Sequence, residues 1–170
     1  RFIQSMKREL FSDEVYVFSP EGELFALPTG ATPIDFAYKI HTDVGNKCTS
    51  AEVNGTVFSL RYCLQNGDRV KILTNPRGHP NRNWLLWVKT ARARSRIRHW
   101  FNVQDEIHAL AVGKRLLERE VRRHGLSFQV HLKSRELLEV AKKLRLKTVE
   151  GLIIRIGNGK QSAPEIVDLL

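Results

Sequence analysis

The spacing of apolar residues changes once along this chain, at a segment rich in proline and glycine around residues 76–80. Before that segment, short runs rich in Val, Tyr, Phe and Ile predict β-strands over residues 14–19, 23–27, 51–53, 56–58 and 69–74. After it, apolar residues recur every three or four positions, which predicts helices over residues 86–101, 106–124, 132–144 and 148–156, with a fifth beginning at Ser162. The change of period therefore predicts two domains of different class.

The first domain combines these strands with one helix, predicted over residues 32–45. The order strand, strand, helix and further strands is typical of a small mixed sheet with one helix across it, which is the β-grasp or ubiquitin-like arrangement. The dipeptide Asn54-Gly55 supports this order, because both residues accept the positive φ of a type I′ hairpin turn. The predicted fold class is therefore α+β: a small β-grasp domain followed by an all-α helical domain.

The domain boundaries follow from the same patterns. We assign residues 13–76 to the β-grasp domain, residues 77–84 to a linker and residues 85–170 to the helical domain. Residues 1–12 have the spacing of the tail of a preceding amphipathic helix or linker. The chain is therefore expected to be a piece of a longer protein.

The helix over residues 32–45 has clear signals at both ends. Thr32 is a suitable N-cap, Pro33 fits the first helical position, and Asp35 places negative charge near the positive end of the helix dipole. Gly45 offers a stop. His41 is then presented in the last turn, where its default role is a helix-end residue that bonds a free carbonyl. From the local pattern alone, a ligand contact at His41 is the weaker of the two interpretations.

Positive charge is concentrated in the middle of the chain. The formal net charge is +10, yet residues 69–104 contain nine Lys and Arg residues and no Asp or Glu. An exposed protein surface normally mixes both signs, and nine positive charges without a carboxylate repel one another unless an anion such as a phosphate backbone relieves them. This block predicts a surface that faces a polyanion, although an arginine-rich face is often only solvated surface.

The aromatic residues near this block allow two interpretations. Trp84, Trp87, Trp100 and Phe101 have the chemistry to stack on unpaired bases. Aromatic residues at helical spacing in a small helical domain more often form its core, and we favour the core for Trp100 and Phe101.

No enzyme signature is found in the sequence. Phosphate-binding glycine loops, nucleophile elbows and zinc-protease motifs are absent, so no catalytic residue is assigned. Cys48 and Cys63 have neither CxxC nor histidine partners at metal spacing, which favours free thiols in a reducing cytosol over a disulfide or metal site. No apolar run is long enough to cross a membrane. We therefore expect a cytoplasmic protein region with no metal and no cofactor.

Several runs of this sequence carry a family resemblance. Residues 13–22, 27–38 and 40–45 resemble, in order, the TGS domain of the RelA/SpoT family. Residues 66–68, 72–74 and 80–84 continue the match, and residues 88–101 look like the start of that family's helical domain. The resemblance covers roughly residues 13 to 160.

The resemblance implies a function. Family members make and hydrolyse the alarmone (p)ppGpp with N-terminal hydrolase and synthetase domains, so this chain would be a non-catalytic regulatory region that communicates with those domains. In ribosome-dependent members the TGS domain inspects the 3′ CCA end of an uncharged tRNA, and the helical domain lies along ribosomal RNA. The family's CCA-contacting histidine carries onto His41, with Thr42 and Lys39 beside it. The implied contacts to the RNA backbone are Lys89, Arg92, Arg94, Arg96, Arg98 and Arg82.

The resemblance leaves one alternative open. Family members of the SpoT type keep nearly the same TGS motif but sense through acyl carrier protein, an acidic partner that a basic patch would also attract. A protein-docking regulatory module that switches the balance of synthetase and hydrolase is therefore the second hypothesis.

Overall fold

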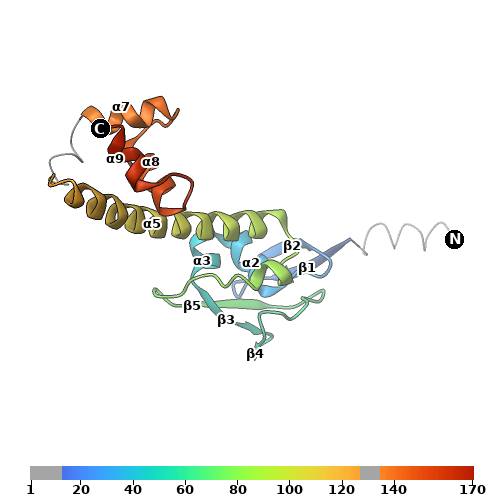
Figure 1. Cartoon of the computed structure of the whole chain (residues 1–170). Coiled ribbons are helices and arrows are strands. Elements are labelled where there is room, and N and C mark those ends of the chain that lie inside the picture. The colour runs from blue at the N-terminus through green and yellow to red at the C-terminus, as the bar shows by residue number, and fades with distance from the viewer. Residues whose placement is uncertain (1–12, 127–134) are drawn as a thin grey trace. The chain divides into compact units, whose positions relative to one another are not determined.

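The computed structural model describes residues 13–126 and 135–170 of the chain, which forms two compact units (Figure 1). The first unit ends at Phe101 and the second begins at Asn102. The tail predicted over residues 1–12 and the first part of the helix predicted over residues 132–144 lie outside the described residues.

The strands of the first unit form two small antiparallel sheets. The described strands are β1 (Glu14–Phe18), β2 (Leu24–Pro28), β3 (Cys48–Val53), β4 (Thr56–Phe58) and β5 (Val70–Thr74). β1 pairs with β2, and β3 lies between β4 and β5. A parallel bridge between Phe18 and Arg69 joins the two sheets, and the Phe18 amide donates to the Asp68 carbonyl at 2.8 Å. This confirms the predicted α+β, β-grasp class.

The hairpin between β3 and β4 also confirms its prediction. Asn54 and Gly55 have φ values of 54° and 85°, as a type I′ turn requires. Asn54 is held there because its side-chain amide donates to the Asp68 carboxylate at 3.0 Å.

Helix α2 (Pro33–Ile40) is buried on two sides, between the strands and the first turns of helix α5 (Figure 1). Phe36 faces the strands and packs with Val17 and Val53. Ile34 and Tyr38 face the opposite way, into a second cluster of buried residues. The helix therefore has an apolar surface on two sides.

The helix predicted over residues 32–45 is interrupted at His41. α2 ends at Ile40, His41 is extended with φ −167° and ψ 148°, and a short helix α3 (Thr42–Asn46) follows. Gly45 does not stop the helix as expected. Gly45 lies inside α3 instead. A glycine is needed at this position because the ring of Tyr38 occupies the space that a Cβ atom would fill.

The segment predicted as a linker and as the start of the helical domain packs on the first unit. Trp84 begins helix α4 (Trp84–Trp87), is only 4% exposed, and shares its buried cluster with Val88, Ala93 and Ile97. These residues cover the face of α2 that the strands leave open. The compact first unit therefore extends to Phe101, beyond the boundary drawn at residue 76.

Two helices predicted separately, over residues 86–101 and 106–124, are one helix, α5 (Ala91–Arg123). No glycine or proline lies between residues 101 and 106, so nothing in the backbone ends the helix there. Residues before Ala91 are not part of it, since Val88 is extended with φ −81° and ψ 148°.

The second unit is helical, as predicted. With the later turns of α5 it contains, among the described residues, α7 (Arg135–Lys143), α8 (Val149–Gly157) and α9 (Ala163–Asp168). The side chain of Thr148 accepts the Gly151 amide and that of Ser162 accepts the Glu165 amide, so each residue caps the helix predicted to begin there. In the described part of the chain, no helix is long and apolar enough to cross a membrane.

The core of this unit forms where α5, α7, α8 and α9 meet. Leu117, Leu137, Leu152 and Ile166 are fully buried there. Gly113 of α5 meets the carbonyl of Ile153, and Gly157 meets the carbonyl of Ala109. The backbones of α5 and α8 approach each other this closely because neither glycine carries a side chain.

Candidate nucleic-acid interface

His41 lies at the exposed junction between α2 and α3. Its side chain is 66% exposed, and its backbone amide donates to the Ala37 carbonyl at 3.2 Å. The Nδ1 atom accepts the Asp43 amide at 3.0 Å, so His41 caps the N-terminus of α3. The default interpretation, in which His41 bonds a free carbonyl at a helix end, is therefore wrong.

This cap determines the tautomer of His41. An Nδ1 atom that accepts a hydrogen bond carries no proton, so the proton of the neutral ring is on Nε2. The Asp43 carboxylate is 3.7 Å from the same Nδ1, a longer contact that becomes an ion pair only if the ring is protonated. The 3.0 Å amide contact fits the neutral ring, whose Nε2–H donor is not used by the cap.

The buried side chain of Tyr38 stabilises the junction between α2 and α3. Its hydroxyl donates to Oδ1 of Asn46 at 2.8 Å, which ties the end of α3 back to α2. Burial raises the pKa of Tyr38 well above its usual value, so the hydroxyl stays a donor at every physiological pH. With Gly45 against the Tyr38 ring, these contacts determine the angle at which His41 projects.

Lys39 and Thr42, the predicted neighbours of His41, lie on either side of it. Lys39 is exposed in the last turn of α2, and Thr42 is half-buried in the first turn of α3. The structure therefore places all three residues at one helix junction.

A groove runs beside this junction. It has a volume of about 570 Å³, and its lining includes Phe25, Ile40, Val44 and Lys71. Ile40 and Val44 come from the two helices that His41 separates, and Lys71 comes from β5. The groove thus offers apolar surface next to the histidine, and its charged lining consists of Lys71 together with Glu21 and Glu23.

The basic residues predicted to contact the RNA backbone lie on the first turns of α5 and just before it. Arg92 and Arg96 lie on one flank of a buried stripe formed by Ala93 and Ile97, and Arg94 and Arg98 lie on the other flank. The four arginines therefore form two pairs. Arg94 is half-buried and donates to the Val88 carbonyl at 3.2 Å, whereas the other three are exposed.

Lys89 and Arg82 are exposed as well, but each lies against a neighbour. The Lys89 side chain lies over Gly30, and the Arg82 guanidinium stacks on the Phe101 ring at 4.4 Å from its centroid. In residues 13–126 and 135–170, the side chains of Arg92, Arg96 and Arg98 make no ion pair with a carboxylate.

The buried carboxylate of Asp35 positions the start of α5. It accepts the amide of Lys89 at 3.0 Å, the amide of Thr90 at 2.9 Å and the hydroxyl of Thr90 at 2.8 Å. Within its own helix it accepts the amide of Thr32 at 3.0 Å. Sequence reasoning assigned Asp35 only to its own helix. The bond to Thr90, 55 residues away, has no local signal.

The cysteines show no sign of catalytic activation. Cys48 is buried at 2% exposure, and burial raises the pKa of its thiol to about 12, far from the range of a nucleophilic thiolate. Cys63 is exposed and not disulfide-bonded. Over the described ranges, no cluster of three or more His, Cys, Asp or Glu residues is placed to hold a metal ion.

Comparison with known proteins defines the class of this chain. Residues 15–74 match the TGS domain, and residues 100–170 match the RelA/SpoT AH domain. A β-grasp unit that carries the TGS match and is followed by helices that carry the AH match defines a TGS and AH regulatory region. The chain belongs to the RelA/SpoT family, which confirms the resemblance.

Curated relatives agree with this assignment. A GTP pyrophosphokinase of Myxococcus xanthus is 44% identical over 165 residues, which are 97% of this chain and 22% of that protein. A guanosine-3′,5′-bis(diphosphate) 3′-pyrophosphohydrolase of Aquifex aeolicus is 40% identical over 168 residues, 99% of this chain and 23% of that protein. The bifunctional (p)ppGpp synthase/hydrolase RelA of Mycobacterium tuberculosis is 40% identical over 171 residues, 99% of this chain and 23% of that protein. The chain thus spans less than a quarter of each relative, and the two domains it matches are TGS and AH rather than catalytic domains.

Proposed function

We propose that this chain is the non-catalytic regulatory region of a cytoplasmic (p)ppGpp synthetase/hydrolase, and that it reads the free 3′ CCA end of an uncharged tRNA on the ribosome. The enzymatic part of this proposal comes from the names of the relatives, each of which is more than four times as long as the matched segment. The part of the proposal that concerns tRNA sensing rests on residues of the first unit.

The observation that carries the proposal is the position of His41. The ring is exposed, its Nδ1 is engaged in the cap of α3, and its Nε2–H points to no partner within the cap. A neutral donor of this kind suits the oxygen atoms of a ribose or a base edge at an RNA end. Thr42 and Lys39 add a hydroxyl and an ammonium group at the same junction.

The adjacent groove supports the same proposal. Phe25, Ile40 and Val44 provide apolar surface for an unstacked base. Glu21 and Glu23 share the lining with Lys71, so the groove suits the base rather than its phosphate. An aminoacyl group on the terminal ribose would enlarge the ligand at the point where it contacts the protein, so a charged tRNA would fit less well.

The arginines on α5 would position the RNA without reading its sequence. Arg92, Arg96 and Arg98 are exposed and have no carboxylate partner in the described residues, which suits them to phosphate oxygens. Together with Lys89, Arg94 and Arg82 they are the proposed contacts to the RNA backbone.

A second candidate function is docking of an acidic protein such as acyl carrier protein. It is favoured by Leu86, which is 81% exposed in α4 with Arg82 and Lys89 close to it in sequence. An exposed leucine among cations matches an interface with an apolar centre and a charged rim.

Ribosome binding tests the leading proposal. The affinity of the 170-residue chain for ribosomes would be measured with deacylated and with aminoacylated tRNA in the A site, for the original chain and for His41→Ala. We expect the original chain to prefer deacylated tRNA by at least about tenfold, and His41→Ala to lose most of that preference. His108→Ala, an exposed histidine on α5, is the matched control and should keep it.

The outcomes separate the two candidates. Equal binding of both tRNA forms by the original chain would overturn CCA reading. Binding of an acidic carrier protein that is lost in Leu86→Asp, with ribosome binding unchanged, would favour the second candidate. Salt dependence adds a further check, because each phosphate contact contributes about 0.7 to 0.9 to the slope of log affinity against log salt. Arg92→Ala with Arg96→Ala should therefore lower that slope by about 1.5.

A further inference from the structure

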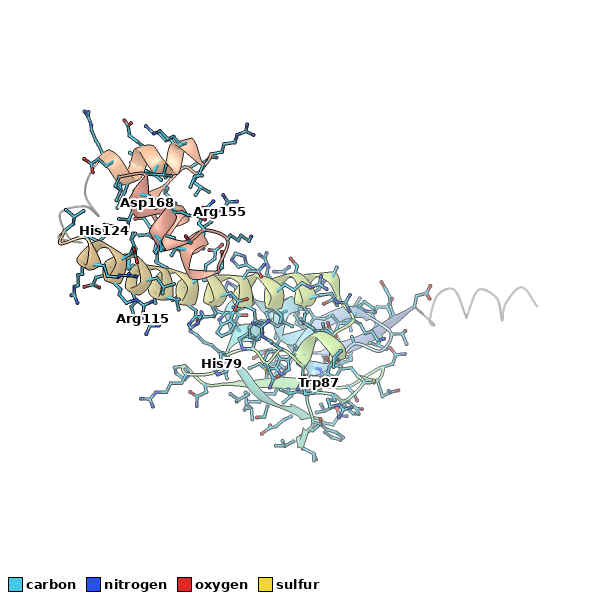
Figure 2. The ribbon with its side chains drawn as sticks, viewed as in Figure 1. His79, Trp87, Arg115, His124, Arg155 and Asp168 are labelled. Carbon is cyan, nitrogen blue, oxygen red and sulfur yellow. The ribbon has the colours of Figure 1, made fainter. Side chains whose placement is uncertain are left out.

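A second pocket lies elsewhere on the first unit, with a volume of about 510 Å³. It is formed by the loop after β5, by β3 and by α4, and its lining includes Thr49, Arg77, His79, Asn81, Trp84 and Trp87. Figure 2 labels His79 and Trp87 on this part of the molecule. None of these residues belongs to the His41 junction or to the arginine pairs on α5.

The pocket combines aromatic surface with positive charge. No Asp or Glu lines it. Within the part of the chain that the structure describes, the Arg77 guanidinium has no hydrogen bond or ion pair, and only its backbone amide is engaged, by Oδ1 of Asn75 at 2.9 Å. An unpaired guanidinium beside indole rings favours a ligand that is both flat and anionic.

His79 extends an existing stack toward this pocket. Its ring is nearly parallel to that of Trp100, with an interplanar angle of 10° and 5.5 Å between the ring centroids. Its Nδ1 is 3.0 Å from the Pro80 carbonyl, which can only accept, so Nδ1 carries a proton and the neutral ring leaves Nε2 as an acceptor. A base placed against the free face of His79 would continue the stack, and Nε2 at the ring edge is left to accept from a ribose hydroxyl or an amino group beside that base.

Trp87 offers the second aromatic surface. It is half-buried in α4, and the Arg61 guanidinium lies 5.5 Å from its ring centroid. The guanidinium covers one face of the indole, so a base would stack on the other face, and the charge of Arg61 adds to the positive potential around the pocket.

The loop that carries Arg77 and His79 is held in place before any ligand binds. The Asn75 amide donates to the Lys47 carbonyl at 3.0 Å, and the Gly78 amide donates to the Asn75 carbonyl at 2.8 Å. A Cβ atom at Gly78 would come within 2.7 Å of the Lys47 carbonyl oxygen, so the loop packs directly on the backbone before β3. A loop already ordered loses little entropy on binding.

We propose that this pocket binds an unstacked nucleotide of single-stranded RNA, with its base between His79 and Trp87 and its phosphate on Arg77. The proposal rests on the RNA-binding function proposed above and adds a contact that is independent of the 3′ end. An acidic protein is less suited to the site, because aromatic and hydrogen-bonding side chains make up most of the lining and Leu60 is its aliphatic member.

The test uses a short single-stranded RNA that ends in a 3′-phosphate, so that recognition of a free terminal ribose cannot contribute. Its affinity for the 170-residue chain would be measured by fluorescence anisotropy at low salt. Arg77→Ala and His79→Ala are the test variants, since both residues are exposed and neither belongs to the buried core. Lys160→Ala is the matched control, because it removes one exposed positive charge from the second unit.

We expect each test variant to bind at least about fivefold more weakly, and Lys160→Ala to change the affinity less than about twofold. Loss of affinity should be larger for single-stranded than for duplex RNA, because a duplex cannot insert a base. Because this RNA has no free terminal ribose, a loss of its affinity in Arg77→Ala or His79→Ala separates failure of this site from failure of CCA reading.

Two results would overturn the proposal. One is an affinity in both test variants equal to that of Lys160→Ala. The other is an equal loss for duplex and single-stranded RNA, which would make Arg77 a plain phosphate contact with no base in the pocket. Circular dichroism melting of each variant shows whether it remains folded, and Arg77→Lys, which keeps the charge, should recover part of the affinity if the charge matters.

Discussion

Asp35 and Thr90 are joined by two hydrogen bonds, from the amide of Thr90 at 2.9 Å and from its hydroxyl at 2.8 Å to the same carboxylate oxygen. Thr90 in turn accepts the Ala93 amide at 3.1 Å and so caps α5. One buried carboxylate therefore serves the N-termini of two helices, α2 through Thr32 and α5 through Thr90.

Asp35→Asn should destabilise the first unit by about 2–4 kcal/mol. The amide group brings a donor to a site where every neighbour is already a donor, so at least one backbone amide loses its partner. Chemical denaturation of the chain measures the change. Thr90→Ser keeps the hydroxyl and is the matched control, with an expected cost below about 1 kcal/mol. Equal costs for the two variants would mean that the carboxylate contributes nothing beyond packing.

Gly45→Ala should disturb the His41 junction, because the new methyl group would overlap the ring of Tyr38. We expect a cost of about 2 kcal/mol or more and a changed amide resonance for Asp43, whose hydrogen bond to His41 reports on the cap. Stability and NMR spectra of the variant provide both readouts.

A double-mutant cycle with Tyr38→Leu isolates this contact. The smaller side chain vacates the space, so Gly45→Ala should cost less in the Tyr38→Leu background than in the original chain. Additive costs would show that the glycine is required for another reason.

The stability of the first unit should fall at alkaline pH. Burial raises the pKa of Cys48 from 9.0 to about 12, and burial also raises the pKa of Tyr38, so folding favours the protonated form of both. This contribution is complete below the unfolded pKa and is lost as the pH rises through the folded pKa. For Cys48 alone the loss between pH 8 and pH 10.5 is roughly 2 kcal/mol in the free energy of unfolding.

Cys48→Ala should flatten this alkaline decline, as measured by denaturation at pH 8 and pH 10.5. Thiol labelling at pH 8 gives an independent check, since the exposed Cys63 should react at once and Cys48 only after unfolding. Rapid labelling of both thiols in the folded chain would contradict the burial of Cys48.

Gly113→Ala and Gly157→Ala should each destabilise the second unit by about 2–4 kcal/mol. Each methyl group would meet a backbone carbonyl of the other helix, at Ile153 or Ala109, and a carbonyl inside a helix has no room to move. Thermal melting monitored by circular dichroism measures the change.

Gly151→Ala is the control for these variants. This glycine is also in α8, but a Cβ atom there would meet only the Thr148 hydroxyl at 3.3 Å. The higher helix propensity of alanine should make this variant neutral or up to about 1 kcal/mol more stable. If Gly113→Ala and Gly157→Ala cost no more stability than Gly151→Ala, the close approach of α5 and α8 would be ruled out.

Local signals predicted much of the fold. The turn at Asn54 and the helix starts at Thr148 and Ser162 are found where the sequence places them, because each depends on the chemistry of a few consecutive residues. The family of the chain was also readable from its motifs. The predicted ligand contacts at His41 and on α5 remain predictions.

The interruption of the helix at His41 had no comparable signal. Residues 32–45 have one continuous apolar period, and the contact of Tyr38 with Gly45 that accompanies the break forms only when the chain is folded. Trp84 and Val88 were likewise assigned to a linker and to a helix by pattern, whereas their burial against α2 makes them part of the first core.

The sequence by itself determined the order of strands and helices, the concentration of positive charge in residues 69–104 and the presence of a histidine near the end of a capped helix. Only the tertiary structure decided that Asp35 holds the start of α5 and that Arg77, His79 and Trp87 share a pocket. The reason is physical. Periodicity and capping act over a few residues, whereas these contacts join segments that come together only when apolar surface is buried between them.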